Sequence, residues 1–364
     1  MTVLRQECYK LFIKRGFLFL VILFVGFDIA STISDLKATI TLSQPSLLVY
    51  KDYIESYKGD VTDEKMQEIN SIRNEVELVY KNKQEIQEKY KNNLISRKEY
   101  EEKIAEFNKY ESKTEGINAF LNVVDAAWMN GTQIMDNTGW NVLLNDSSID
   151  IFLVVIIISL VVLLCIYDIE TGFDYIKLST VNGKSILLKS QLTLIISFSV
   201  FIGAFISLVK YWIIDLVYGL DGYSFALQNI VGFEQSTKET SILSAYILLS
   251  AIKTFGLIFL AIITFTIGVF LSSSLYSSFF SFALTYLPAY ILRDKRLLYF
   301  LPFPSAMLLG KGWFTSLISE GDTYFAEIST KEMSEYFLFM TLVIVILTIT
   351  SMCHKLKGRI KRRR

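Results

Sequence analysis

A polar stretch between two long apolar runs constrains this chain most. Residues 149–166 and 186–209 are almost entirely apolar, and residues 165–191, CIYDIETGFDYIKLSTVNGKSILLKSQ, link them. An apolar run of about 18 residues or more is long enough to cross a bilayer as a helix. The link is therefore interpreted as a loop between two membrane spans. Its lysines, Lys177, Lys184 and Lys189, favour the cytoplasmic side, where short loops are positively charged.

Composition agrees with a membrane protein. Of the 364 residues, 52% are hydrophobic, and their clustering into long runs excludes a water-soluble fold. The 36 basic and 36 acidic residues cancel, so net charge says nothing about partners. The basic tail, residues 354–364, directly follows a span, which favours attraction to anionic lipid over nucleic-acid binding. The three cysteines fall at the expected cytoplasmic ends of spans, and we expect no disulfide framework.

The apolar runs predict six spans. Residues 241–292 contain one charge, Lys253, and would form ~75 Å of helix at ~1.5 Å per residue, enough to cross twice. We place the break at Ser272–Ser274. The tail 354–364 has seven basic residues in eleven, which puts both termini in the cytoplasm. The predicted spans are residues 17–34, 149–167, 186–209, 243–268, 272–292 and 336–353.

The fold class is thus an all-α integral membrane protein, with residues 1–35, 36–148 and 149–364 as its three parts. Residues 1–15 are either an amphipathic elbow helix on the inner membrane surface or a plain basic flank. Residues 293–335 lie outside and contain two short apolar stretches, 301–304 and 306–314, that dip into the membrane and return.

Residues 36–148 form an insert between the first and second spans, placed outside the cell. Thr62 begins one helix, and Ser96 with Glu99 forms a capping box that begins a second. Apolar residues recur at three- and four-residue steps, which predicts an antiparallel coiled-coil hairpin. A helix of about 30 residues would project ~45 Å as a stalk. Residues 116–140 form a platform at its base.

Sequence motifs for catalysis are weak. Residues 182–185, NGKS, resemble the end of a phosphate-binding loop, but Leu178 occupies the position of the first glycine. The single histidine, His354, lies in the basic tail, so we expect no metal site and no cofactor on this chain. Catalysis by the chain alone is not expected.

Two charged residues within spans are candidates for a translocation cavity. Lys253 needs a partner, a water-filled cavity or a subunit interface, since an unpaired ammonium in a membrane is costly. It is either a structural pairing or a cavity residue that meets an anionic substrate or head group. Asp28 is either a solvated or packing group near the outer end of its span or a functional acid.

The link also carries a family pattern: Glu170, Thr171 and Gly172, then Ile176, Leu178, Ser179 and Thr180, then Gly183, Lys184 and Lys189. This pattern resembles the first cytoplasmic loop of the permease subunits of type-two ABC exporters. Val181 and Lys184 depart from the proline and arginine that are common there. Together with the elbow, the span number and the short apolar stretches, the resemblance covers about two thirds of the chain and excludes the insert.

The resemblance implies a bacterial plasma-membrane permease that moves or extracts an amphipathic substrate, such as a lipid-like molecule, peptide or antibiotic. It implies a second permease, identical or paralogous, and two copies of an ABC ATPase that bind ATP and Mg²⁺. The alternative is a membrane-anchored sensor or scaffold that displays the hairpin without transport. The residues expected to couple to the ATPase are Asp168, Glu170, Gly172, Phe173, Tyr175 and Ile176.

Overall fold

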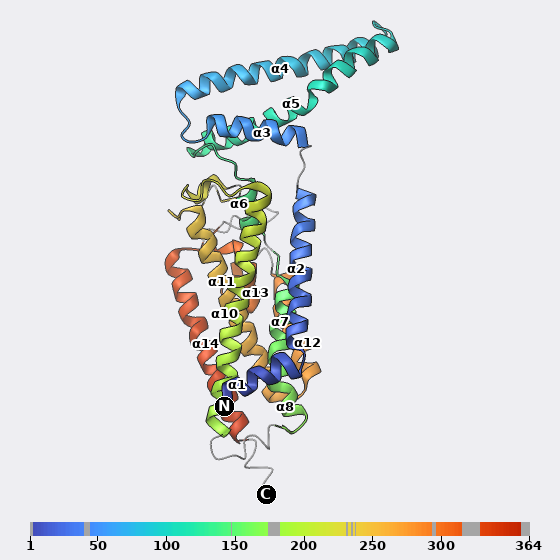
Figure 1. Cartoon of the computed structure of the whole chain (residues 1–364). Helices are drawn as coiled ribbons and strands as arrows, with labels where there is room; N and C mark the ends of the chain where they lie inside the picture. Colours follow the sequence, from blue (N-terminus) through green and yellow to red (C-terminus); the bar gives the residue numbers. More distant parts are fainter. Residues whose placement is uncertain are drawn as a thin grey trace.

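The computed structural model describes residues 3–39, 44–146, 148–173, 183–230, 232–233, 236, 238–292, 296–314 and 328–357. Within these ranges the regular elements are helices, together with two isolated bridges, Gly59–Ile134 and Ala226–Ser241. Figure 1 shows a bundle of long helices with a separate helical group across one end. The all-α architecture agrees with the sequence analysis.

Among the described residues, five helical segments are long and apolar enough to cross a membrane, which fits a multi-pass membrane protein. The predicted fifth span, residues 272–292, is a helix but is not one of the five, so the sixth crossing stays a prediction. The five segments are Phe17–Ser34, Ile151–Glu170, Ile186–Tyr218, Ile242–Leu271 and Thr330–Lys355. The helices that contain these segments are α2 (Phe17–Thr39), the continuous run of α7 (Ile151–Val161), η2 (Val162–Ile166) and α8 (Tyr167–Glu170), α10 (Gly183–Tyr218), α11 (Ile242–Leu271) and α14 (Thr330–Lys357). The helix at the predicted fifth span is α12 (Ser274–Ile291).

The break between α11 and α12 falls at the predicted serines. Ser272 ends α11 in a left-handed conformation, φ 54°, and α12 begins two residues later. Just before the turn, a Cβ on Gly268 would overlap the Ile166 side chain. Glycine therefore lets α11 pack closely against η2, the continuation of α7.

Short helices fill the bundle between its long members. The second expected stretch, 306–314, coincides with α13 (Pro304–Leu309) and η5 (Lys311–Trp313), and α13 and Trp313 are buried. The first, 301–304, is not a helix except at Pro304, where α13 begins. α13 packs against α11, where a Cβ on Gly256 would lie 2.9 Å from the Cβ of Met307. The remaining short helices are η3 (Leu227–Asn229) and η4 (Arg296–Tyr299).

The insert differs from the expected stalk. Figure 1 shows α4 (Asp63–Lys91) running across the end of the bundle rather than along its axis. α4 packs against α5 (Arg97–Asn130), and α3 (Gln44–Tyr57), which the sequence analysis did not predict, packs on the other part of α5. The expected platform consists of the end of α5 and α6 (Thr138–Asn145).

Direct contacts fix the insert to the bundle. Trp140 Nε1 donates a hydrogen bond of 2.7 Å to the carbonyl of Asp221, and Lys51 Nζ donates one of 3.2 Å to the carbonyl of Tyr218. Gly139 packs so closely on Gly219 that an added Cβ would lie 2.9 Å from its carbonyl oxygen. The insert therefore rests on the end of α10 and the loop that follows it.

The N-terminal segment lies at the opposite end of the bundle. Helix α1 (Val3–Tyr9) and the π-helical turn η1 (Lys10–Lys14) lie across the bundle near α8, and α14 ends in the same region (Figure 1). This agrees with a helical N-terminal segment. The two ends of the bundle are thus chemically distinct, one covered by the insert and one by α1 and α8.

Candidate functional site

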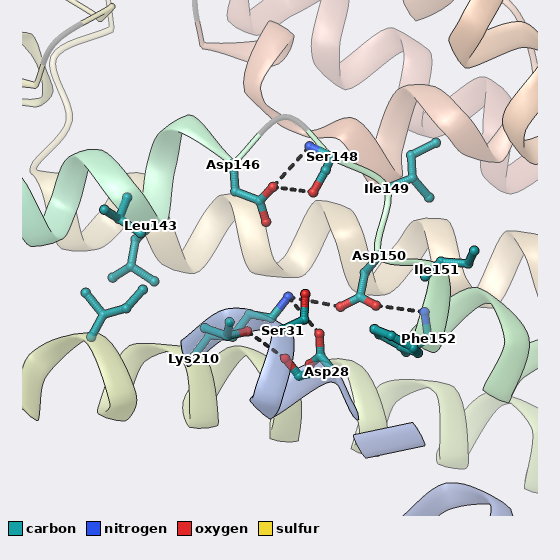
Figure 2. Close-up of a pocket in the computed structure, with 13 residues that line it drawn as sticks. Asp28, Ser31, Leu143, Asp146, Ser148, Ile149, Asp150, Ile151, Phe152 and Lys210 are labelled. Carbon is teal, nitrogen blue, oxygen red and sulfur yellow. Dashed lines mark hydrogen bonds and ion pairs between the residues drawn. The ribbon is translucent and has the colours of Figure 1, made fainter. Parts of the chain in front are cut away.

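A cavity of ≈ 290 Å³ lies between α2, α10 and the link from α6 to α7, on the insert side of the bundle (Figure 2). A smaller cavity of ≈ 60 Å³ adjoins it between α10, α11 and the same link, and both are lined by Asp146, Asp150 and Lys210. The larger cavity is also lined by Asp28, Ser31, Thr32, Val142, Leu143, Ser148, Ile149, Ile151, Phe152 and Ile214.

Lys210 joins two carboxylates from different elements. Its Nζ lies 2.9 Å from Asp150 Oδ2 and 3.3 Å from Asp28 Oδ1 (Figure 2). Only 7% of the Asp28 side chain is exposed, against 24% for Lys210 and 17% for Asp150. One ammonium is shared between two desolvated carboxylates, which ties α2 and the start of α7 to α10.

Asp150 has a second role as the cap of α7. Its Oδ1 accepts hydrogen bonds from the backbone amides of Phe152, at 3.0 Å, and Leu153, at 3.1 Å. An aspartate in this position satisfies free amides of the first helical turn and is stabilised by the helix dipole. The capping geometry thereby orients Oδ2 toward Lys210 and fixes one wall of the cavity.

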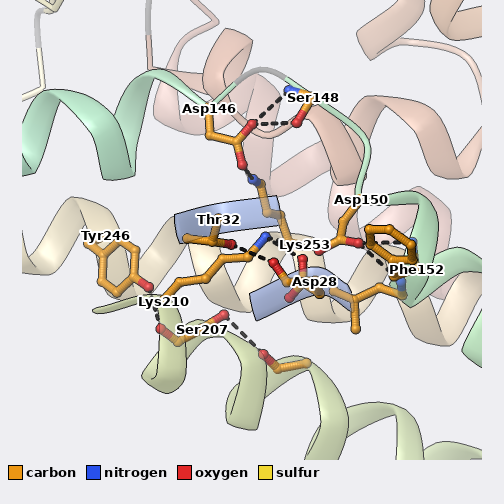
Figure 3. Close-up of polar contacts among 12 residues, drawn as sticks. Asp28, Thr32, Asp146, Ser148, Asp150, Phe152, Ser207, Lys210, Tyr246 and Lys253 are labelled. Carbon is orange, nitrogen blue, oxygen red and sulfur yellow. Dashed lines mark hydrogen bonds and ion pairs between the residues drawn. The ribbon is translucent and has the colours of Figure 1, made fainter. Parts of the chain in front are cut away.

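Lys253 meets the partner that its position within α11 requires. Its Nζ lies 3.8 Å from Asp146 Oδ2, while Asp146 Oδ1 accepts a hydrogen bond from the Ser148 amide at 3.0 Å (Figure 3). Burial raises the pKa of the Asp146 carboxyl, but Lys253 and the Ser148 hydroxyl lower it by more, so this pKa lies below its usual value. Asp146 is therefore ionised at neutral pH.

The structure brings Asp28 and Lys253 into one connected cluster without direct contact between them. Asp28 lines the larger cavity and Lys253 the smaller one, and the residues between them are Asp150, Lys210 and Asp146. The sequence analysis missed these three. The available signals were an aspartate immediately before an apolar run, typical of a helix cap, and a lysine about two turns before the end of an apolar helix.

The opposite end of the bundle contains a second charged contact. Asp168, 1% exposed, pairs with Lys10 at 2.6 Å and with Arg15, whose guanidinium lies 4.7 Å from the centre of the Tyr167 ring. Lys10 also pairs with Glu7 at 2.8 Å. The N-terminal segment is therefore attached to α8, and Asp168 points into this contact rather than toward an open surface.

The other residues expected to couple to a partner lie beyond this contact. Phe173 is 57% exposed, and Glu170, also exposed, accepts hydrogen bonds from the Ser274 amide at 3.3 Å and from the Ser274 hydroxyl. Gly172 has φ 73°, which ends α8. Tyr175 and Ile176 lie outside the described residues.

Neither the search for metal-binding residues nor the comparison with known proteins identifies a function. Within the described residues, no group of three or more His, Cys, Asp or Glu is placed to hold a metal ion. Comparison with protein-family models, with curated proteins and with solved structures finds no match to this chain. The two charged sites are therefore the basis for a functional assignment.

Proposed function

We propose that the chain is the membrane-spanning permease subunit of an ATP-driven ABC exporter. The observation that carries the proposal is the arrangement at α8, where one short helix contacts η1 through Asp168 and α12 through Glu170. Phe173 is exposed beside these contacts. A subunit that docks on Phe173 and displaces α8 would act on three elements of the bundle together.

A movement of α8 would be passed into the bundle through the helices that are continuous with it. α8 continues η2 and α7 without a break, and α7 begins at Asp150 beside the cavity. A rigid displacement of this continuous helical segment would change the distance between Asp150 and Lys210 at its other end. Rigid-body movement of packed helices is a common form of such transitions.

The remaining parts of the proposal come from the family resemblance. The protein lies in the plasma membrane of a bacterium, with the insert outside the cell and both termini in the cytoplasm. The partners are two ATPase subunits that bind ATP and Mg²⁺, and a second permease, identical or paralogous. The substrate is amphipathic and enters the cavity beneath the insert.

Affinity purification of the tagged full-length chain from its native membrane tests the proposal. We expect a stoichiometric ATPase to copurify with the wild-type chain and with Glu77→Lys, which reverses an exposed charge on the insert. Glu170→Lys should reach the membrane in equal amount but lose the ATPase. Equal recovery of the ATPase with all three proteins would contradict the role of Glu170.

The second candidate function is a sensor or scaffold. It is favoured by the insert, which exposes apolar side chains, among them Leu78 on α4 and Leu94 between α4 and α5, at 62% and 71%. If the folded wild-type chain purifies without any ATPase, this function replaces transport.

A further inference from the structure

We propose that the larger cavity binds a positively charged head group, an ammonium or guanidinium, of an amphipathic molecule. The proposal deepens the exporter assignment by naming the substrate class of its cavity. Binding itself requires no ATPase, so its test can fail while the exporter assignment remains, and the reverse is also true.

Charge is the first argument. The connected cluster contains three carboxylates, those of Asp28, Asp146 and Asp150, and two ammonium groups, those of Lys210 and Lys253. When all five are ionised, the cluster carries one surplus negative charge, which either a proton on Asp28 or a bound cation would neutralise. A carboxylate removed from water without full compensation is destabilised, and a ligand cation would supply the missing charge.

The distances from the ammonium groups show which carboxylate has its negative charge least compensated. Lys210 is shared between two carboxylates and is closer to Asp150, at 2.9 Å, than to Asp28, at 3.3 Å. Asp28 is also the most buried of the three carboxylates, with 7% of its side chain exposed. A ligand cation would therefore bind beside Asp28, on the side of the cavity lined by Ser31 and Thr32 (Figure 2).

Shape and wall chemistry favour an amphipathic ligand. One part of the wall is charged or carries hydroxyl groups, and the other part is apolar, formed by Val142, Leu143, Ile149, Ile151, Phe152 and Ile214. The volume of ≈ 290 Å³ lies just below the roughly 300–1,000 Å³ typical of ligand pockets. It accommodates a head group with a few carbon atoms, while a longer chain would extend outside.

An anionic ligand fits the same site less well. The sequence analysis left open an anionic head group for Lys253, but Lys253 faces Asp146 at 3.8 Å and Lys210 faces two aspartates. A phosphate or sulfate would have to compete with these carboxylates and would add to the surplus negative charge. The surplus therefore selects against anions.

Equilibrium binding of radiolabelled dodecylammonium to the full-length chain in phosphatidylcholine nanodiscs tests the proposal, with empty nanodiscs as background. We expect saturable binding that decyl or dodecyl sulfate does not displace. Asp28→Asn should weaken binding at least tenfold, whereas Asp28→Glu and the insert variant Glu77→Gln should stay within threefold of wild type. Unsaturable binding, or wild-type affinity in Asp28→Asn, would overturn the proposal.

A second measurement does not depend on the folding of the Asp28 variants. Ser31→Cys, in a chain whose three native cysteines are replaced, places a thiol in the cavity wall. Its reaction rates with cationic and anionic methanethiosulfonates are each divided by those of the exposed control Ser71→Cys. We expect the normalised rate with the cationic reagent to exceed that with the anionic reagent at least tenfold, and dodecylammonium to abolish this difference. Equal normalised rates would contradict the proposal.

Discussion

Asp168 Oδ2 lies 2.6 Å from Lys10 Nζ, although the two residues are 158 positions apart in the sequence. The contact is largely desolvated, with 1% of the Asp168 side chain and 17% of the Lys10 side chain exposed. It joins the N-terminal segment to the end of the helical segment that begins at Asp150. The position of α8 therefore depends on α1 and η1 as well as on α7.

Asp168→Asn is expected to destabilise this end of the bundle. Removing one partner of a buried ion pair costs about 3–5 kcal/mol, because the remaining charge is left without compensation. Here Lys10 would keep Glu7, whereas Arg15 would lose the charged partner seen in the structure. Thermal unfolding of the purified chain should show a clear fall in Tm for Asp168→Asn and a small one for Glu170→Gln, whose side chain is exposed. Equal small shifts would contradict this account.

Lys210→Met is expected to destabilise the fold strongly, because it leaves Asp28 and Asp150 close together without their shared ammonium. The loss of stability should be about 3–5 kcal/mol. Adding Asp28→Asn to Lys210→Met should restore part of this stability, because it removes one of the two carboxylates left without an ammonium. A double-mutant cycle measured by unfolding should give a coupling energy of about 0.5–3 kcal/mol, and additive effects would exclude the shared ion pair.

Several elements of the structure were predictable because their signals are local. Thr62 and Ser96 cap α4 and α5 as expected, with their side chains accepting from the Lys65 and Glu99 amides. The turn at Ser272 follows from helix length against membrane thickness. Such features depend on a few neighbouring residues, so their pattern in the sequence is sufficient.

Features that depend on distant contacts were not predictable. The predicted third span ends at residue 209, just before Lys210, but α10 continues to Tyr218 and Lys210 lies within it. The orientation of α4 across the bundle depends on contacts such as Trp140 with Asp221, which no periodicity reveals. Likewise, nothing near Asp168 in the sequence identifies Lys10 as its partner.

The pKa of Asp146 predicts a dependence of stability on pH. Because this pKa is lower in the folded chain than the ordinary value of about 3.9, ionised Asp146 stabilises the fold above that value, and the contribution is lost as pH falls through the folded pKa. The difference in Tm between wild type and Asp146→Asn should be constant from pH 7 to about pH 5 and shrink below about pH 4. A difference that grows on acidification would contradict the assigned direction.

Gly116 is expected to be essential for the packing of α3 on α5. A Cβ there would overlap the Ser46 carbonyl oxygen and lie 2.9 Å from the Val49 Cβ, so Gly116→Ala should destabilise the insert by about 1–3 kcal/mol. Gly26→Ala in α2 is the control, since its Cβ would meet no atom within 4 Å. Limited proteolysis should cleave the insert faster only in Gly116→Ala; equal rates would exclude the close contact.

The most direct test of the exporter assignment is site-specific photo-crosslinking at Phe173 in the native membrane. A photoreactive residue at Phe173 should form a crosslink to a protein that contains a nucleotide-binding motif and hydrolyses ATP. The same residue at Leu78, exposed on the insert at the other end of the molecule, should not. A folded chain that forms no ATPase crosslink at Phe173, or forms it equally at Leu78, would contradict the assignment.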